Sequence, residues 1–230
     1  MIYLYCLTDA HPKDLEFLSP EYASLLPFDQ YAVVFCNKDR SRLYSDRDVM
    51  MHYDVSALIM RQRFTVLPFA YGTFLPAGEA IAFLEKKKKA IEVAMATFRD
   101  KEEMGMKVLV PAGDSGAELQ KRLGESPGHR YLSGRMSNHG PALSGLETLS
   151  PFRREVEQRF APICTRIKFK AHCVPKSILA NVSFLIERQN IDTFSNALRN
   201  LKHAFPCYKF LISGPWPAYN FIDLPDDVGM

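Results

Sequence analysis

Histidines are the residues of this chain best suited to acid–base or metal chemistry, because they titrate near neutral pH and are common metal ligands. The six are His11, His52, His129, His139, His172 and His203. None pairs with another histidine, a cysteine or an acid at metal-ligand spacing on an obvious shared helix face. The common phosphate, zinc and hydrolase signatures, such as GxGxxG, HExxH and GxSxG, are absent. We therefore expect no enzyme activity, no metal and no cofactor.

The nearest approach to a catalytic motif is the tetrapeptide Gly-Asp-Ser-Gly at residues 113–116. The same four residues surround the nucleophile of trypsin-like serine proteases. The rest of that machinery is not recognisable, since the chain has too much helical patterning and no disulfide framework. The cysteines are odd in number, scattered and never spaced as CxxC: Cys6, Cys36, Cys164, Cys173 and Cys207. This usage predicts reduced thiols in a cytosolic protein.

The charge balance excludes phosphate backbones as the main partner. The 230 residues carry 29 Lys and Arg against 26 Asp and Glu, a formal net charge of +3. The candidate basic residues are dispersed and lack the aromatic platform of an RNA-recognition sheet: Arg61, Arg63, Arg153, Arg154, Lys168 and Lys170. No apolar run reaches the ~18 residues of a membrane span, and the N-terminus lacks signal-peptide features. We expect a soluble cytosolic protein that binds neither nucleic acid nor a membrane.

The first half of the chain predicts two helices among strands. Residues 1–8 and 31–37 are so continuously apolar that we expect them to be central strands of a sheet. A helix over 46–62 places Met51, Val55, Leu58 and Ile59 on one apolar face. His52 lies near this face, so we expect a core or interface histidine with one hydrogen bond. The extended segment 63–76 contains Pro68, which predicts an edge or bulged strand.

A longer helix is predicted over 77–100, with Leu84, Ile91, Met95 and Phe98 as its buried stripe. The four consecutive lysines 86–89 interrupt this stripe. They span a wide arc of the helix, so we expect a solvated surface rather than a binding site for acidic partners. A strand over 106–112 follows.

The second half begins with a stretch of different composition. Residues 113–149 are rich in Gly, Ser, Pro and Asn, with helical character only at 117–123, and predict a mobile linker. A helix begins near Pro151 and carries Phe152, Val156 and Phe160. The remaining elements are predicted as strands at 163–173 and 177–187, a helix at 190–205, and strands at 207–214 and 218–224.

This order of elements predicts an α+β fold with helices on one face of each sheet. We expect two small domains: an N-terminal α+β domain over 1–112 and a C-terminal α+β domain over 163–230. A Gly/Ser-rich, partly helical linker over 113–162 joins them.

Two segments are too unusual to be explained as general core. The first runs from His52 to Thr73 and contains Val-Leu-Pro-Phe-Ala-Tyr-Gly-Thr at 66–73. The second, residues 211–222, contains Gly-Pro-Trp-Pro at 214–217. Its two prolines fix the backbone and remove two donors, so we predict a stiff elbow that carries the only tryptophan. We expect Tyr219 and Phe221 to follow on an alternating strand.

With these segments, and with Tyr3-Leu4-Tyr5 near the N-terminus, the chain resembles the GvpF/GvpL family of gas vesicle proteins. The middle of the chain echoes the family's G-x-x-Y-L only weakly, at Gly128–Leu132, and is shorter than in many members. The usual Phe before Gly-Thr is Tyr71 here. The resemblance implies an N-terminal and a C-terminal α+β domain, the latter ferredoxin-like.

The resemblance implies structural work at the gas vesicle and no catalysis. We expect a minor vesicle component that acts in assembly and nucleation. Its implied partners are other minor vesicle proteins and the hydrophobic shell protein GvpA, whose premature aggregation it would limit. The candidate shell-protein interface or structural motif comprises Pro68, Phe69, Tyr71, Gly72, Thr73, Phe74, Gly214, Pro215, Trp216, Pro217, Tyr219 and Phe221.

Two alternatives stay open at this point. Trp216 between two prolines is often a core plug that locks a turn, and Pro68 and Gly72 often only shape a strand. The chain could also be a small-molecule-binding regulatory module built on ferredoxin-like domains, which predicts a compact apolar pocket with convergent polar groups.

Overall fold

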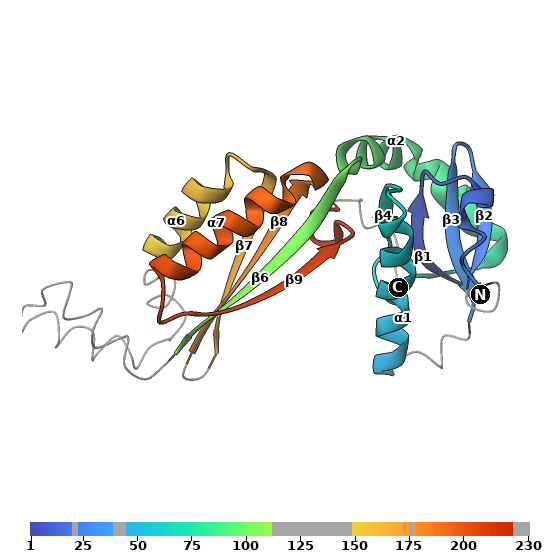
Figure 1. Cartoon of the computed structure of the whole chain (residues 1–230). Coiled ribbons are helices and arrows are strands. Elements are labelled where there is room, and N and C mark those ends of the chain that lie inside the picture. The colour runs from blue at the N-terminus through green and yellow to red at the C-terminus, as the bar shows by residue number, and fades with distance from the viewer. Residues whose placement is uncertain (20–22, 39–44, 112–148, 175–176, 223–230) are drawn as a thin grey trace, which may run out of the picture. The chain divides into compact units, whose positions relative to one another are not determined.

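The computed structural model of the chain describes residues 1–19, 23–38, 45–111, 149–174 and 177–222 (Figure 1). The chain forms two compact units, each with its own sheet and core. Unit 1 comprises Met1–Glu103 and Pro215–Met230, and unit 2 comprises Met104–Gly214. This division differs from the expected boundaries near residues 112 and 163. The segment that we expected to be a linker, including the helix at 117–123, lies outside the described residues up to residue 148.

Unit 1 is built on a five-stranded antiparallel sheet. Its strands are β1 (Ile2–Thr8), β2 (Ser24–Phe28), β3 (Tyr31–Asn37), β4 (Val66–Pro68) and β5 (Phe74–Leu75). They lie in the order β2-β3-β1-β4, with β5 also pairing with β1. The apolar strands β1 and β3 are central, as predicted. Pro68 lies on β4 at the edge, where its missing N–H costs no ladder bond. Strand β2 was not predicted.

Two helices, α1 (Asp46–Arg61) and α2 (Ala80–Phe98), pack against strands of this sheet. α1 starts at a capping box formed by Ser45 and Asp48. The expected stripe of α1 is partly wrong, because Leu58 is 41% exposed. The stripe of α2 is buried as predicted. Lys87 is also buried, although we expected lysines 86–89 to form a solvated surface. The described short 3-10 turns of this unit are η1 (Pro12–Leu15), η3 (Ala77–Glu79) and η5 (Tyr219–Phe221).

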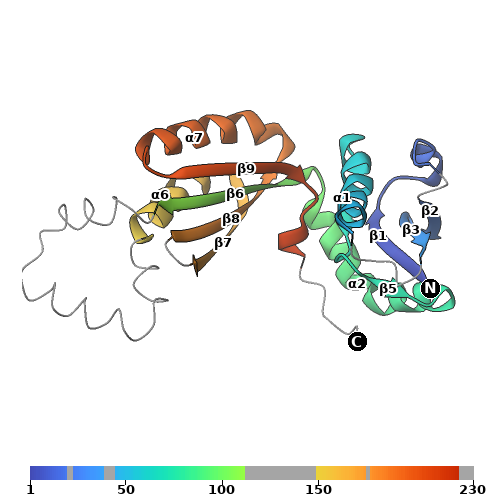
Figure 2. The same cartoon turned by 90° about the horizontal axis from the view of Figure 1, so that it is seen from below.

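Unit 2 has the ferredoxin-like order of elements, strand-helix-strand-strand-helix-strand. These are β6 (Lys101–Pro111), α6 (Ser150–Phe160), β7 (Cys164–Val174), β8 (Ser177–Glu187), α7 (Ile191–Ala204) and β9 (Lys209–Trp216), with a 3-10 turn, η4 (Arg188–Asn190), before α7. The sheet order is β7-β8-β6-β9, which Figure 2 shows. α6 and α7 contact each other and cover one face of the sheet (Figure 1). The core between them contains the rings of Phe152, Phe160, Phe184 and Phe194.

The ferredoxin-like fold is therefore confirmed, but its first half lies outside the expected range 163–230. A split β-α-β unit needs a strand between the two that its helix connects. Here β8 fills that place, so β6 and α6 belong to the same sheet and core as the later strands. Sequence patterns identified both elements, but the expected boundaries placed the strand in the N-terminal domain and the helix in the linker.

The expected last strand at 218–224 is wrong over residues 218–222, and residues 223 and 224 lie outside the described residues. β9 instead continues through Gly214 and Pro215 to Trp216, and the chain then forms the 3-10 turn η5. Local bonds hold this turn: the Tyr219 N–H donates to the Pro217 carbonyl (2.7 Å) and the Phe221 N–H to the Ala218 carbonyl (3.0 Å). Among the described helices, none combines the length and apolarity required to cross a bilayer.

Candidate functional site

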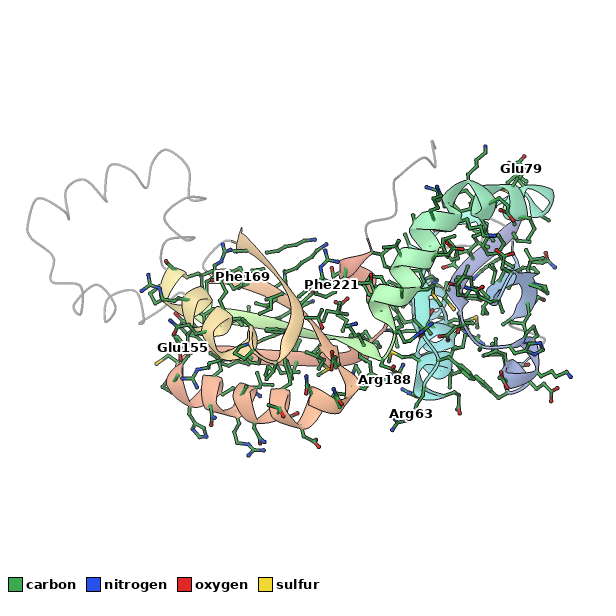
Figure 3. The ribbon with its side chains drawn as sticks, turned by 90° about the horizontal axis from the view of Figure 1, so that it is seen from above. Arg63, Glu79, Glu155, Phe169, Arg188 and Phe221 are labelled. Atoms are coloured by element: carbon green, nitrogen blue, oxygen red, sulfur yellow. The ribbon has the colours of Figure 1, made fainter. Side chains whose placement is uncertain are left out.

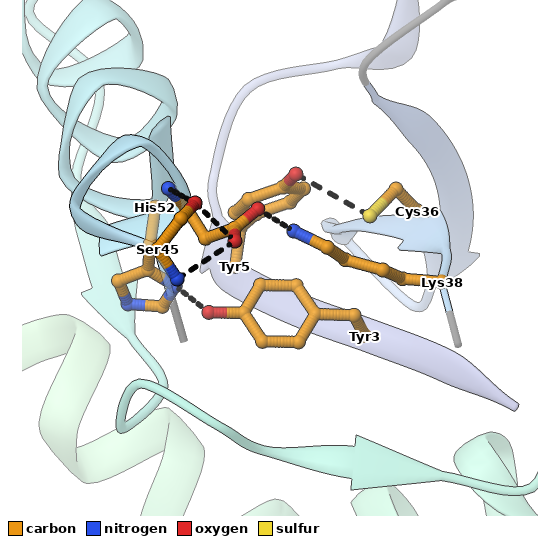
Figure 4. A network of polar contacts seen from close by, with 7 residues as sticks. Tyr3, Tyr5, Cys36, Lys38, Ser45 and His52 are labelled. Carbon is orange, nitrogen blue, oxygen red and sulfur yellow. Dashed lines mark hydrogen bonds and ion pairs between the residues drawn. The ribbon is translucent and has the colours of Figure 1, made fainter. Parts of the chain in front are cut away.

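His52 is the point where the two unusual segments meet. It lies on α1 and is fully buried. Its Nδ1 is 2.7 Å from the Tyr3 hydroxyl (Figure 4). Its Nε2 is 3.1 Å from the Phe69 carbonyl oxygen. A carbonyl can only accept, so Nε2 carries the proton and Nδ1 accepts from the Tyr3 O–H. His52 thus connects β1 to the chain that follows β4.

Burial keeps this histidine neutral. It lowers the pKa of His52 to about 4, although the bond to the Phe69 carbonyl opposes the change. Burial also raises the pKa of Tyr3, which therefore remains a protonated donor. The expected core histidine is confirmed, with two hydrogen bonds instead of one. This geometry makes the pair a structural clamp between three segments.

Aromatic rings surround His52, and we call them the aromatic cluster: Tyr3, Tyr5, Tyr53, Tyr71, Phe74, Trp216 and Tyr219. The ring centres of Tyr71 and Tyr219 lie 5.7 and 5.9 Å from that of His52. Tyr53 contacts Tyr219 edge-on at 4.9 Å and Trp216 at 6.2 Å. Such edge and tilted contacts each add about 0.5–1.5 kcal/mol beyond burial. The cluster joins β1, α1, the turn before β5 and the elbow.

The predicted interface residues are therefore mostly interior. Five are buried: Pro68, Phe69, Phe74, Pro217 and Phe221. Tyr71, Thr73, Trp216 and Tyr219 are half-buried, and Gly72, Gly214 and Pro215 are exposed. Packing accounts for the buried members. A contact of the exposed and half-buried members with a partner stays a prediction.

The elbow is anchored by a carboxylate from the start of β6. Glu103 is 3% exposed, and its Oε2 accepts from the Asn220 N–H at 2.8 Å. The Asn220 side chain donates to the other oxygen of the same carboxylate. Phe221, labelled in Figure 3, is 1% exposed beside this contact. Gly214 has φ of +113°, a conformation that favours glycine and permits the bend.

Polar contacts fix the N-terminal end of α1 beside the cluster. Asp48 pairs with Lys38 and with the Ser45 hydroxyl, and Lys38 Nζ lies 5.7 Å from the centre of the Tyr3 ring (Figure 4). Lys38, together with Ser45, lowers the pKa of Asp48 to about 2. The Tyr5 hydroxyl donates to Cys36 Sγ at 3.3 Å. α1 is thus held at its start as well as at His52.

Another side of α1 forms an apolar groove that the sequence analysis did not identify. The groove has a volume of about 390 Å³. The α1 groove, as we call it, is lined by Phe17, Leu18, Met50, Met51, Val55 and Leu58, with Arg47 and Asp54 at its polar positions. Phe17, Met50 and Leu58 are 44%, 56% and 41% exposed. Leu58 was assigned to the buried stripe, and its place in this groove is why it faces outward.

Chemistry at these sites is limited among the described residues. No three His, Cys, Asp or Glu side chains there are arranged to hold a metal ion. Cys6, Cys36, Cys164 and Cys207, whose side chains the structure describes, are free. Burial raises the pKa of Cys6 and of Cys164 to about 12 each, so neither forms a thiolate near neutral pH.

Comparisons with known proteins extend over both units. Residues 1–223 match the model of a family described as gas vesicle synthesis protein GvpL/GvpF. Gas vesicle protein F of Streptomyces sp. (strain CB03234) is 28% identical over 189 residues, 77% of this chain and 78% of that protein. Gas vesicle protein F2 of Halobacterium salinarum is 24% identical over 183 residues, 78% of this chain and 70% of that protein.

Two solved structures share the fold. The crystal structure of gas vesicle protein GvpF from Anabaena sp. PCC7120 matches with a TM-score of 0.76 and 17% identity, covering 96% of this chain and 95% of that one. The structure of GvpF from Microcystis aeruginosa matches with a TM-score of 0.75 and 16% identity, covering 97% and 99%. At these identities the likeness concerns the fold.

Proposed function

Because this chain belongs to the GvpL/GvpF family of gas vesicle synthesis proteins, we propose that it is a minor vesicle protein acting in assembly and nucleation. In this proposal it binds the hydrophobic shell protein GvpA, together with other minor vesicle proteins, and limits premature aggregation of the shell protein. It acts at the gas vesicle, as a binding protein and not as an enzyme.

The α1 groove is the observation that carries this proposal. Large apolar side chains gathered on one exposed surface mark sites where another apolar surface binds. A shell subunit destined for an insoluble wall exposes such a surface before it is incorporated. Covering one Phe, Met or Leu side chain contributes about 1.5–3 kcal/mol when burial is complete. Phe17, Met50 and Leu58 are already partly buried, so each gains only part of this.

The aromatic cluster supports the groove from the other side of α1. His52 and Ser56 of this helix face the interior, while Met50 and Leu58 face outward. The clamp to Tyr3 and Phe69 therefore fixes the position of the helix that presents the groove. A preorganised surface loses less entropy on binding than a mobile one. The motifs at residues 66–73 and 214–221 thus act indirectly, by fixing the position of α1 and of the groove on it.

A small-molecule site is the alternative use of the same groove. Its volume of about 390 Å³ falls in the range of ligand pockets, roughly 300–1,000 Å³. Arg47 and Asp54 would then orient a ligand. Such a ligand would raise the melting temperature in the absence of GvpA, which separates the two uses.

The test is capture of GvpA by the purified chain with and without the apolar side chains of the groove. The groove variant carries Met50→Gln and Leu58→Gln, which preserve helix propensity. The matched control carries Ile81→Gln and Val93→Gln on α2, where these side chains are 40% and 66% exposed outside the groove lining. Both variants thus remove two exposed apolar side chains from a helix of unit 1.

We expect the groove variant to bind GvpA at least tenfold more weakly, which corresponds to 1.4 kcal/mol or more. It should also lose the ability to delay GvpA aggregation, measured by light scattering. The control should behave like the unmodified chain. Equal capture by all three proteins, or equal loss in both variants, would overturn the proposal.

A further inference from the structure

The face of the unit 2 sheet opposite α6 and α7 carries a second surface, unrelated to the α1 groove. It is exposed only in part, because Leu185 of β8, which pairs with Arg166 on this side, is fully buried. α6 and α7 cover one face, and Phe169 of β7 points to that side, with its ring centre 6.4 Å from that of Phe152 (Figure 3). Side chains alternate along a strand, so the residues on either side of Phe169 face away from the helices. The pairing of β7 with β8 sets Lys168 opposite Ser183 and Lys170 opposite Asn181.

Strands β6 and β9 extend this face. A Cβ placed on Gly105 would lie 2.6 Å from Ser213 Oγ, so residues 105 and 213 are neighbours on one side of the sheet. The alternation then places Lys107 and Leu109 of β6 on that side with Leu211 and Lys209 of β9. Met106 and Val108 point to the opposite side and belong to the core under α6 and α7. The two strand pairs therefore share the face of the sheet that points away from α6 and α7.

We call this surface the basic sheet face. Its exposed lysines are Lys107, Lys170 and Lys209. Arg166 and Lys168 lie on the same side, and each already has an interaction within the chain. The acidic residues that the alternation places on this face of the sheet lie only near strand ends. They are Glu103, which accepts from the Asn220 N–H, and Glu187, which accepts from Gln189 at 2.7 Å. Arg166 and Lys170, four residues apart, span about 13 Å along β7.

Protection of sheet edges explains only part of this pattern. Lysines on edge strands discourage pairing with other chains, and β7 and β9 are both edges. Lys107, however, lies on the inner strand β6, where no edge needs protection. Leu109 and Leu211 are also 41% and 62% exposed on the same face. Exposed leucines beside lysines offer apolar contact and complementary charge to a partner that is both apolar and acidic.

The lack of aromatic rings on this face argues against RNA as the partner. RNA-recognition sheets stack bases on exposed aromatic side chains. Phe169 of β7 and Phe210 of β9 cannot stack bases in this way, because both rings pack toward Phe152 in the core. We infer that the basic sheet face docks an acidic segment of a partner protein, in which carboxylates alternate with apolar side chains.

The experiment uses the full chain and a fluorescent 12-residue peptide of alternating glutamate and leucine. Binding is measured by anisotropy at low and at physiological salt. The face variant carries Lys107→Gln, Lys170→Gln and Lys209→Gln. The matched control carries Lys86→Gln, Lys89→Gln and Lys202→Gln, which remove three exposed charges from α2 and α7. Both variants therefore have the same net charge, and circular dichroism confirms that each is folded.

We expect saturable, salt-sensitive binding by the unmodified chain and by the control, and about tenfold weaker binding by the face variant. A peptide with glutamine in place of glutamate should bind as weakly. The inference is overturned if the unmodified chain does not bind the acidic peptide, or if both variants lose affinity equally. It is also overturned if oligouridylate binds more tightly than the peptide through the same lysines, since the face would then be a nucleic-acid surface.

Discussion

Replacing His52 by phenylalanine tests the structural clamp of unit 1 most sharply. The substitution keeps a ring of similar size inside the aromatic cluster but removes both hydrogen bonds. The Tyr3 hydroxyl and the Phe69 carbonyl then remain buried without their partner. An unsatisfied buried polar group costs about 1–3 kcal/mol, so the two together cost about 4 kcal/mol. For a unit of this size that lowers Tm by roughly 15 °C.

A double-mutant cycle isolates the pair. Tyr3→Phe alone leaves His52 Nδ1 unsatisfied and should cost about 1–2 kcal/mol. In the Tyr3→Phe/His52→Phe protein both partners of that bond are gone. The stability losses of the two single variants should therefore add up to about 1–2 kcal/mol more than the loss measured for the double variant. Urea unfolding followed by tyrosine and tryptophan fluorescence reports the stability of unit 1. Lys89→Ala, at an exposed position of α2 in the same unit, is the control and should cost under about 0.5 kcal/mol.

The same residue predicts a pH dependence. The pKa of His52 is lowered from 6.5 to about 4 in the folded protein, so between these values the unfolded chain binds more protons. Stability is then complete above pH 6.5 and falls by about 3 kcal/mol as the pH drops to 4. The His52→Phe protein should lack this slope. A loss of under 1 kcal/mol in His52→Phe, or an unchanged slope between pH 6.5 and 4, would refute the clamp.

Three further outcomes follow from single positions. Asp48→Asn should cost about 1 kcal/mol in urea unfolding, through the capping box and the Lys38 pair, and should remove stability that is otherwise lost between pH 3.8 and about 2. Gly72→Ala should cost about 1 kcal/mol in the same assay, because φ is +89° although no atom lies within 4 Å. Gly72→Asn should lower stability less than Gly72→Ala, because asparagine tolerates a positive φ better. Equal losses in the two variants would exclude backbone strain as the cause. In thiol labelling of the native protein, exposed Cys207 should react well before Cys6, which is fully buried with a pKa of about 12; simultaneous labelling would contradict the structure.

Sequence patterns predicted the elements whose own periodicity determines their place. β1 and β3 have no polar alternation and are central, while α2 buries the residues that its heptad-like spacing selects. Strand β2 was missed because Ser24–Phe28 is short and contains Pro27. The predicted strand after the elbow was wrong because prolines and local turn bonds dominate there, although its residues alternate in polarity.

Long-range assembly was the part that the sequence could not supply. β6 and β7 contribute to one sheet although about 50 residues separate them. The sequence of neither strand specifies which other strand it pairs with. The contact of His52 with Tyr3, 49 residues away, likewise depends on how α1 packs on β1. The sequence did not reveal the α1 groove because its apolar residues come from α1 and from Phe17, Leu18 and Ala23, which are separate from α1 in the sequence.

Vesicle formation in cells tests the central claim most directly. A gas-vesicle-forming strain that lacks this chain is complemented with the unmodified protein, the groove variant or the α2 control, and vesicles are counted by electron microscopy. Our account predicts vesicles with the unmodified protein and the control, and few or none with Met50→Gln/Leu58→Gln at equal protein levels. Normal vesicles with the groove variant, or in the strain without the chain, would contradict it.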